Sequence, residues 1–285
     1  MLEFFAKLDR RWIFLLMFLT VSIAILAQVK FPEKVSPMVQ NVFDTIEGLP
    51  EGRTVLMAFD YDPASAGELQ PMAAAFTRHC ALKKHKLYYS TLWPQGVPMI
   101  QRSIEILNSE FEDYKYGEDY VNLGYRTGQE GVIKLMTSDL KKIYGNDVAG
   151  TNLDDIPMTK DLKNIAQIDL IINVSAGTPG TKEWVQYAAT PLQRTMVAGT
   201  TGVGAPSLYP YIPNQMAGLL GAIKGASEYE EAMMAGYPEL KQNLKAQEAK
   251  RRMGPQLIAH VLMLLLIIMG NVIFFSQQRQ QQVSS

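Results

Sequence analysis

Two uncharged apolar segments constrain this chain more than any other feature. Residues 255–275 contain no Asp, Glu, Lys or Arg, and at about 1.5 Å per residue a helix of this length crosses a hydrocarbon layer of about 30 Å. Residues 12–29 are also uncharged and just long enough to span. They follow a basic tail at 1–11, but the apolar run is long and ends without a small-residue cleavage site, which indicates an uncleaved anchor. The sequence therefore predicts a soluble domain held to a bilayer by two transmembrane helices.

Composition excludes several classes of protein. The formal net charge of -1 gives no electrostatic reason to expect a nucleic-acid partner. The single cysteine, Cys80, excludes an intrachain disulfide framework and a cysteine-based metal site. His79 and His85 flank the end of a predicted helix, where we expect them to be exposed, and they lack metal-ligand spacing. We therefore expect no metal and no cofactor.

The side of the membrane on which the domain lies stays open. The tails carry four basic residues and the flanks on the domain side carry seven, and this bias favours a cytoplasmic domain. A long domain is translocated largely regardless of charge, and the basic N-terminus is typical of an anchor that begins in the cytoplasm. We expect an integral protein of a bacterial or archaeal cell membrane.

The region between the two apolar segments alternates between strand and helix patterns. Strand patterns cover 54–59, 87–92, 120–125, 169–174 and 195–198, and helical patterns cover 64–84, 97–111, 129–144, 160–166 and 181–193. This alternation predicts an α/β domain over 53–213, with a mostly parallel sheet of the Rossmann-like or flavodoxin-like kind. The order of the strands does not follow from the sequence.

Four further segments surround the predicted domain. They are an amphipathic juxtamembrane segment at 30–52, a glycine-bearing helix at 214–235, a charged helical stalk at 238–254 and a disordered Gln-rich tail at 276–285. Glycine in a helix interior costs about 1 kcal/mol relative to alanine, so Gly218, Gly221 and Gly225 indicate a close approach of another backbone. That backbone could belong to the same domain or to another subunit, and the sequence leaves both alternatives open.

Ligands of open parallel sheets bind outside the carboxyl ends of the strands. The residues that follow the predicted strands are small, acidic or hydroxylated, and loops of this kind present N–H groups to anions. The candidate ligand-binding residues are Asp60, Asp62, Ser175, Gly177, Thr178, Gly199 and Thr201. The chain contains no GxGxxG and no P-loop lysine motif.

Asp60 and Asp62 form the most suggestive pair among these candidates. An Asp-x-Asp directly after a first strand resembles the start of the haloacid dehalogenase phosphotransferases, and this resemblance implies a nucleophile, an acid/base and Mg²⁺. The resemblance covers this motif alone, because the later strand ends in Val174-Ser175-Ala176-Gly177 without the acidic pair that the family needs. Otherwise the two aspartates cap the following helix.

His260 and Asn271 lie inside a predicted span, where polar groups usually face another helix. Together with the three glycines, they indicate partners among other membrane subunits or further copies of the chain. We expect a non-catalytic, membrane-anchored α/β module that scaffolds or binds a partner. The alternative is a membrane-bound sensor, hydrolase or phosphotransferase that binds a phosphorylated small molecule at the strand ends.

Overall fold

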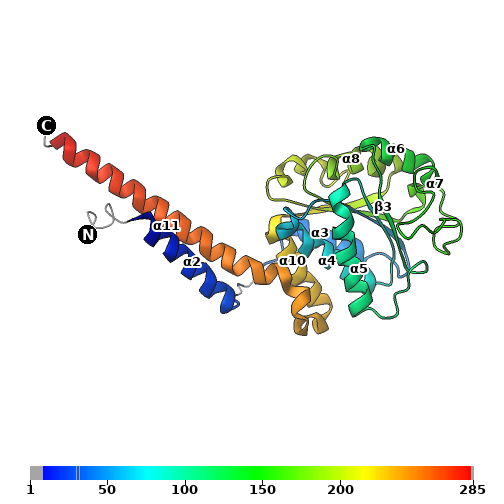
Figure 1. Cartoon of the computed structure of the whole chain (residues 1–285), viewed down its shortest axis with the longest axis horizontal. Coiled ribbons are helices and arrows are strands. Elements are labelled where there is room, and N and C mark those ends of the chain that lie inside the picture. Colours follow the sequence, from blue (N-terminus) through cyan, green and yellow to red (C-terminus); the bar gives the residue numbers. More distant parts are fainter. Residues whose placement is uncertain (1–8, 30, 32, 284–285) are drawn as a thin grey trace. The chain divides into compact units, whose positions relative to one another are not determined.

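The computed structural model describes residues 9–29, 31 and 33–283, and the side chains of 280–283 are not described (Figure 1). The chain divides into two compact units. One is Glu33–Ala249, and the other combines Met1–Pro32 with Lys250–Ser285. Each unit is described by itself.

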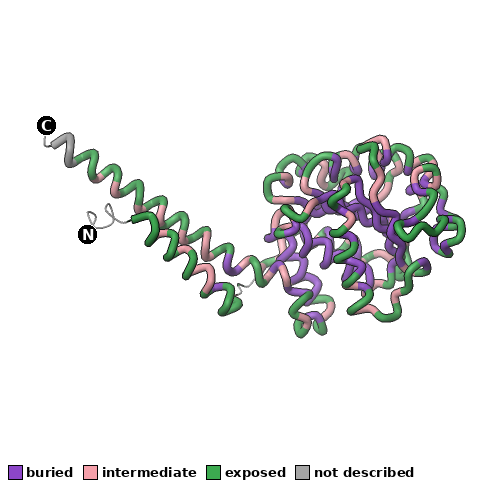
Figure 2. Tube along the Cα trace, viewed as in Figure 1, coloured by how far each residue is buried: buried purple, intermediate pink, exposed green. Residues whose placement is uncertain are grey.

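The first unit is built on one six-stranded sheet in which every neighbouring pair is parallel. Its strands are β1 (Thr54–Asp60), β2 (Lys86–Thr91), β3 (Tyr120–Tyr125), β4 (Leu170–Ser175), β5 (Thr195–Thr200) and β6 (Gly218–Gly221). The order β3-β2-β1-β4-β5-β6 sends the first three strands to one side and the last three to the other. The strands are buried on both faces, which explains their apolar runs (Figure 2).

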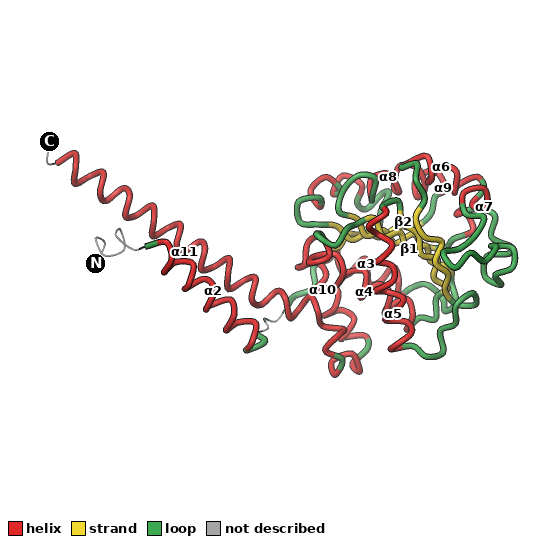
Figure 3. The backbone as a smooth tube through the Cα atoms, viewed as in Figure 1, coloured by secondary structure: helices red, strands yellow, loops and turns green. Residues whose placement is uncertain are grey.

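Helices cover both faces of the sheet (Figure 3). One layer contains α3 (Pro37–Glu47), α4 (Ala66–Leu82), α5 (Val97–Glu110) and α10 (Ala222–Gly236). The other contains α6 (Glu130–Ser138), α7 (Leu140–Ile143), α8 (Thr181–Trp184), the π-helical turn η3 (Val185–Ala189) and α9 (Thr190–Leu192). The prediction of a parallel α/β sheet is confirmed, with a Rossmann-type strand order.

The predicted helix over 214–235 is wrong in its first part. Residues Gly218–Gly221 form β6, which pairs with β5 from Val197↔Gly218 to Thr200↔Gly221, and helix α10 begins only at Ala222. Four residues of Gly-Leu-Leu-Gly carry little strand signal of their own. The ladder to β5 decides their conformation, because local propensity yields to tertiary context.

The three glycines of this region approach the chain's own residues. A Cβ on Gly218 would lie 2.6 Å from the Met38 carbonyl oxygen of α3, and one on Gly225 would lie 2.9 Å from the backbone of Leu220. A Cβ on Gly221 would lie 3.2 Å from the Cβ of Ala205. The close approaches predicted at these glycines are therefore packing inside the domain.

Of the segments that flank the domain, the amphipathic one agrees with its prediction. It contains helix α3, whose apolar face buries Val39, Val42, Phe43 and Ile46 in the domain. The stalk at 238–254 is not one helix, because two short 3₁₀ turns, Pro238–Gln242 and Leu244–Gln247, precede α11 (Glu248–Val283). The Gln-rich tail continues α11 as far as Val283, since Gln and Arg are good helix formers.

The second unit contains α2 (Arg10–Leu26) and most of α11. Among the described residues, α11 is the one helix with the length and apolar composition to cross a membrane. Helix α2 has 17 residues and ends at Leu26, because Gln28 turns the backbone to φ 48°. At about 1.5 Å per residue it spans less than the hydrocarbon layer, so the structure supports one spanning helix where the sequence predicted two.

Gly96 holds the loop after β2 against β1. A Cβ at this position would lie 2.1 Å from Thr91 Oγ1 and 2.4 Å from the carbonyl oxygen of Phe59. We expect Gly96→Ala to lower the free energy of unfolding by about 1–3 kcal/mol, because a backbone carbonyl must shift. Gly131→Ala is the matched control, since no atom lies within 4 Å of its added Cβ in α6. It should gain roughly 0.5–1 kcal/mol, and equal effects in urea titrations would contradict the assignment.

Candidate functional site

The carboxyl edge of the sheet is where the fold places a ligand. The strand order reverses between β1 and β4, which are neighbours in the sheet, and open parallel sheets bind ligands outside the strand ends at this point. The last residues of these strands, Asp60 and Ser175, are register partners. Both are among the predicted ligand-binding residues.

Asp60 is fully buried and its carboxylate is held by three donors. The Leu92 amide donates to Oδ1 at 2.7 Å. The side-chain amide of Asn173 and the indole N–H of Trp184 both donate to Oδ2, each at 2.8 Å. The carboxylate thus joins β1 to the end of β2, to β4 and to α8, and its oxygens are occupied by the protein itself.

A chain of hydroxyl groups extends this network from Asn173. Thr181 Oγ1 donates to Asn173 Oδ1 at 2.7 Å and lies 2.8 Å from Ser175 Oγ. Ser175 Oγ also accepts from the Thr181 amide at 3.0 Å. Ser175 and Thr181 are 2% and 1% exposed, so this predicted ligand-binding serine is also part of the interior.

The two aspartates of the Asp-x-Asp motif differ in environment. Burial raises the pKa of Asp60 to about 7, although its three donors act in the opposite direction. Asp62 lies in the loop after β1, and the hydrogen bonds from Ser65 lower the pKa of its carboxyl group. Asp62 closes the turn that precedes α4, since its Oδ1 accepts from the Ser65 amide at 2.9 Å. The carboxylates have separate structural partners.

Other N–H groups at this edge also donate to acidic side chains. Glu183 Oε2 accepts from the Gly180 amide at 2.8 Å, at the start of α8. Glu68 Oε2 accepts from the Gly202 amide at 2.9 Å, in the loop after β5. An anionic ligand needs such N–H groups and a positive potential. Here carboxylates occupy them and make the edge less favourable for a phosphate.

Arg126 is a basic residue that directly follows β3, at the same edge of the sheet. Its guanidinium donates to three backbone carbonyls, those of Ile143, Tyr125 and Asn146, at 2.9, 2.8 and 3.1 Å. It also lies 4.7 Å above the ring of Tyr144. This arginine therefore fixes the loop after α7.

The remaining candidate residues separate into exposed and buried ones. Gly177 and Thr178 are exposed in the loop after β4, and Thr201 is half-buried after β5. Thr201 Oγ1 accepts from the Gly204 amide at 3.3 Å. Gly199 lies inside β5, where an added Cβ would come within 2.8 Å of Met72 Sδ. The three donors to the Asp60 carboxylate are Leu92, Asn173 and Trp184, and none of these four residues is among them.

A second polar cluster lies in the layer of α3, α4 and α10. His79 Nε2 lies 2.9 Å from Glu47 Oε2, and its Nδ1 lies 2.5 Å from the hydroxyl of Tyr229. The order acid, imidazole, hydroxyl is that of a hydrolase triad. However, His79 and Tyr229 are 0% exposed, so a substrate does not reach the hydroxyl. The prediction of exposed histidines is wrong, since His85 is also buried.

The protonation states in this cluster follow from burial and hydrogen bonding. Burial lowers the pKa of His79 to about 4, although Glu47 acts in the opposite direction, so the imidazole is neutral at pH 7. Burial raises the pKa of Glu47, but hydrogen bonds from His79, Tyr237 and Lys83 outweigh it and set the value at about 2. The ionised Glu47 therefore accepts from the Nε2–H of His79, and Nδ1 accepts from Tyr229.

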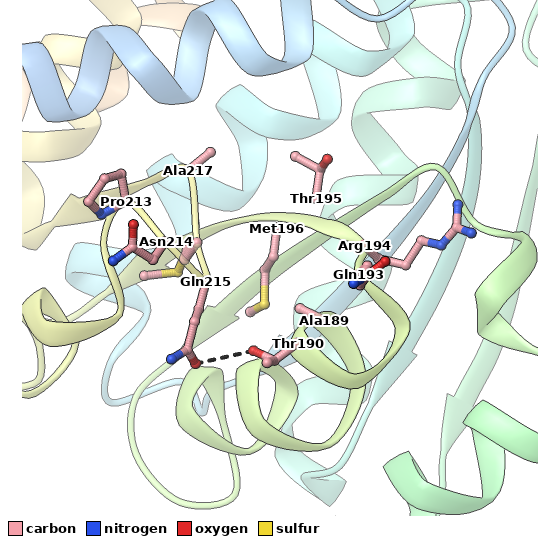
Figure 4. A pocket seen from close by; sticks show the side chains of 11 residues that line it. Ala189, Thr190, Gln193, Arg194, Thr195, Met196, Pro213, Asn214, Gln215 and Ala217 are labelled. Atoms are coloured by element: carbon pink, nitrogen blue, oxygen red, sulfur yellow. Dashed lines mark hydrogen bonds between the residues drawn. The ribbon is translucent and has the colours of Figure 1, made fainter.

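A hollow of about 470 Å³ lies at the opposite, amino edge of β5 and β6. Figure 4 shows Gln215 and Thr190 on its wall, joined by a hydrogen bond of 3.1 Å, while the guanidinium of Arg194 points away from Gln215 and Thr190. Among the described residues of its lining, Arg194 is the charged one, and no Asp, Glu, His or Cys lies beside it there to act as an acid, base or nucleophile. We assign no reaction to it.

Sequence analysis did not identify the residues that donate hydrogen bonds to Asp60. Asn173 gave one signal, as a polar residue inside an apolar strand pattern. Trp184 gave none, because its partner is 124 residues away. A comparison with protein-family models finds no match to the chain, and a comparison with curated proteins finds none either.

Proposed function

We propose that this chain is a membrane-anchored, non-catalytic α/β module that scaffolds or binds a partner in a membrane assembly. The observation that carries the proposal is that the protein's own groups already bind the polar atoms at the carboxyl ends of the strands. Asp60, the first acid of the Asp-x-Asp motif, is 0% exposed and bound by three groups of the protein. Buried, satisfied polar networks fix one arrangement of a core rather than act on a ligand.

Helix α10 bonds to both ends of the domain, as suits a domain with an anchor at its N-terminal end and another at its C-terminal end. Glu228 Oε2 accepts from the Ser36 amide, just before α3, at 2.9 Å. Glu230 Oε1 accepts from the Ala249 amide, near the start of α11, at 2.9 Å. The two glutamates are 4% and 3% exposed. Helix α10 therefore brings the leading and trailing segments of the domain together.

The proposal includes insertion of α2 beside α11 as a second membrane segment. The side chains of α2 are mostly exposed and apolar, among them Phe14 at 70% and Phe18 at 67%. Large exposed apolar surfaces of this kind mark membrane or protein contacts. The Lys/Arg bias of the flanks favours a cytoplasmic domain, which stays part of the proposal.

The alternative function, binding of a phosphorylated small molecule, is less well supported. The four amides of Ser65, Leu92, Gly180 and Gly202 each donate to a carboxylate. A phosphate would have to displace these acids or lie against them. The exposed Gly177 and Thr178 are the residues that such a ligand would contact first.

A ligand screen on the full-length protein in mild detergent separates the two functions. We expect nucleotides and sugar phosphates at 1 mM with Mg²⁺ to leave Tm unchanged, and no phosphatase turnover to appear. A site with Kd of about 10 µM would add about 2.7 kcal/mol under these conditions and raise Tm by several degrees. A shift of that size that disappears in Thr178→Val would refute the non-catalytic proposal. Extraction of the protein from membranes by alkaline carbonate would refute the anchoring.

A further inference from the structure

Helix α11 carries two interleaved stripes with different surroundings. The covered stripe recurs every three or four residues and is half-buried throughout: Leu262, Leu266, Met269, Ile273 and Ser276. Helix α2 has a stripe of the same spacing, Ile13, Met17, Thr20 and Ala24, with Ala24 3% exposed. Both helices belong to one compact unit. The covered stripe is therefore the side of α11 that faces α2.

The open stripe lies on the opposite side of α11 and is exposed throughout. It has the same heptad spacing, with steps of four and three residues: His260, Leu264, Ile267, Asn271, Phe274 and Gln278. Leu264, Ile267 and Phe274 are 59%, 53% and 60% exposed. Between residues 257 and 275 the sequence has two polar side chains, His260 and Asn271, and both lie on this stripe.

A bilayer makes the open stripe unfavourable as a lipid-facing surface. Polar groups in spanning helices face other helices, because hydrocarbon offers no hydrogen-bond partner. Helix α2 does not supply a hydrogen-bond partner for His260 or Asn271, since it packs on the covered stripe. A further helix must therefore cover His260 and Asn271.

We propose that the open stripe pairs with the same stripe of a second copy of this chain, as a parallel two-stranded coiled coil. The proposal rests on the membrane anchoring proposed above. Asn271 is self-complementary, since its amide carries both a donor and an acceptor. In the heptad Asn271 occupies an a position, together with Leu264, and Ile267 and Phe274 occupy d positions. A single asparagine at an a position fixes register and a two-stranded state in parallel coiled coils.

Parallel orientation follows from the topology of identical chains. Two copies inserted in one direction place Asn271 beside Asn271 and His260 beside His260 across the two-fold axis. A charged residue at either site would repel its own copy. The apolar positions between them supply knobs-into-holes contacts at the crossing angle of about 20° common in membranes.

Cysteine cross-linking of the full-length protein in its membrane tests the pairing. Cys80, the single native cysteine, is 0% exposed, so wild type is the blank. We expect Ile267→Cys to form disulfide dimers at least fivefold faster than Leu266→Cys, which faces α2. Equal yields at the two positions would overturn the proposal.

A second measurement follows the asparagine. Asn271→Ala should raise the dimer dissociation constant in detergent about 3- to 30-fold, the range of interhelical hydrogen bonds. Val272→Ala, next to it but off the open stripe, should leave the constant within about twofold. Loss of carbonate-resistant membrane integration would instead contradict the anchoring. A protein that stays integrated but monomeric, or that cross-links through position 267 to another protein alone, would refute the pairing and leave the anchoring intact.

Discussion

Asp60→Asn is expected to lower the free energy of unfolding by about 3 kcal/mol at pH 8. An asparagine side chain has one acceptor oxygen where the carboxylate offers two. Whichever way the amide is turned, its NH₂ group faces a buried donor, either the Leu92 amide or the pair from Asn173 and Trp184. Each buried polar group left without a partner costs about 1–3 kcal/mol.

Asp62→Asn is the matched control for this substitution. Asp62 lies two residues further on, in the turn before α4, and an asparagine side chain makes the same bond to the Ser65 amide as aspartate does. We expect a change within about 0.5 kcal/mol for this variant. Both are measured by urea titration of the full chain in mild detergent, with tryptophan fluorescence as reporter. Equal stabilities of the two variants would show that the Asp60 network does not hold the sheet edge.

His79→Gln is expected to change how stability depends on pH. The pKa of His79 is lowered from 6.5 to about 4 in the folded protein, so its contribution is present above pH 6.5 and is lost as the pH falls towards 4. At about 1.4 kcal/mol per pH unit, the difference between wild type and His79→Gln should be about 3 kcal/mol larger at pH 7 than at pH 4.

Asp60 has the opposite effect on the pH dependence of stability, over nearly the same pH range as His79. Its pKa is raised from 3.8 to about 7, so its contribution is present at low pH and is lost as the pH rises through 7. The two slopes oppose each other in wild type. Stability of Asp60→Asn should therefore fall towards acid pH, whereas stability of His79→Gln should fall towards neutral pH. Parallel pH profiles for the two variants, from urea titrations between pH 4.5 and 7, would refute this assignment.

The sequence alone determined the class of the fold. Five of the six strands lie within one or two residues of their predicted bounds, because buried parallel strands are short apolar runs between helical patterns. The apolar run at 255–275 inside α11 was also evident, since an uncharged run of this length is typical of a spanning helix. The full extent of α11, Glu248–Val283, was not. Periodicity and charge are local properties, and these features depend on them.

Tertiary structure decided the rest. Strand β6 exists because β5 offers a ladder to Gly218–Gly221, and no local pattern distinguishes it from the start of α10. Asp60 reads as a loop carboxylate in sequence, but it is the last residue of β1 and binds Trp184, which is 124 residues away. His79 follows the same rule, since its partners Glu47 and Tyr229 come from α3 and α10. Whether a polar residue is exposed or buried depends on long-range contacts, which sequence spacing does not encode.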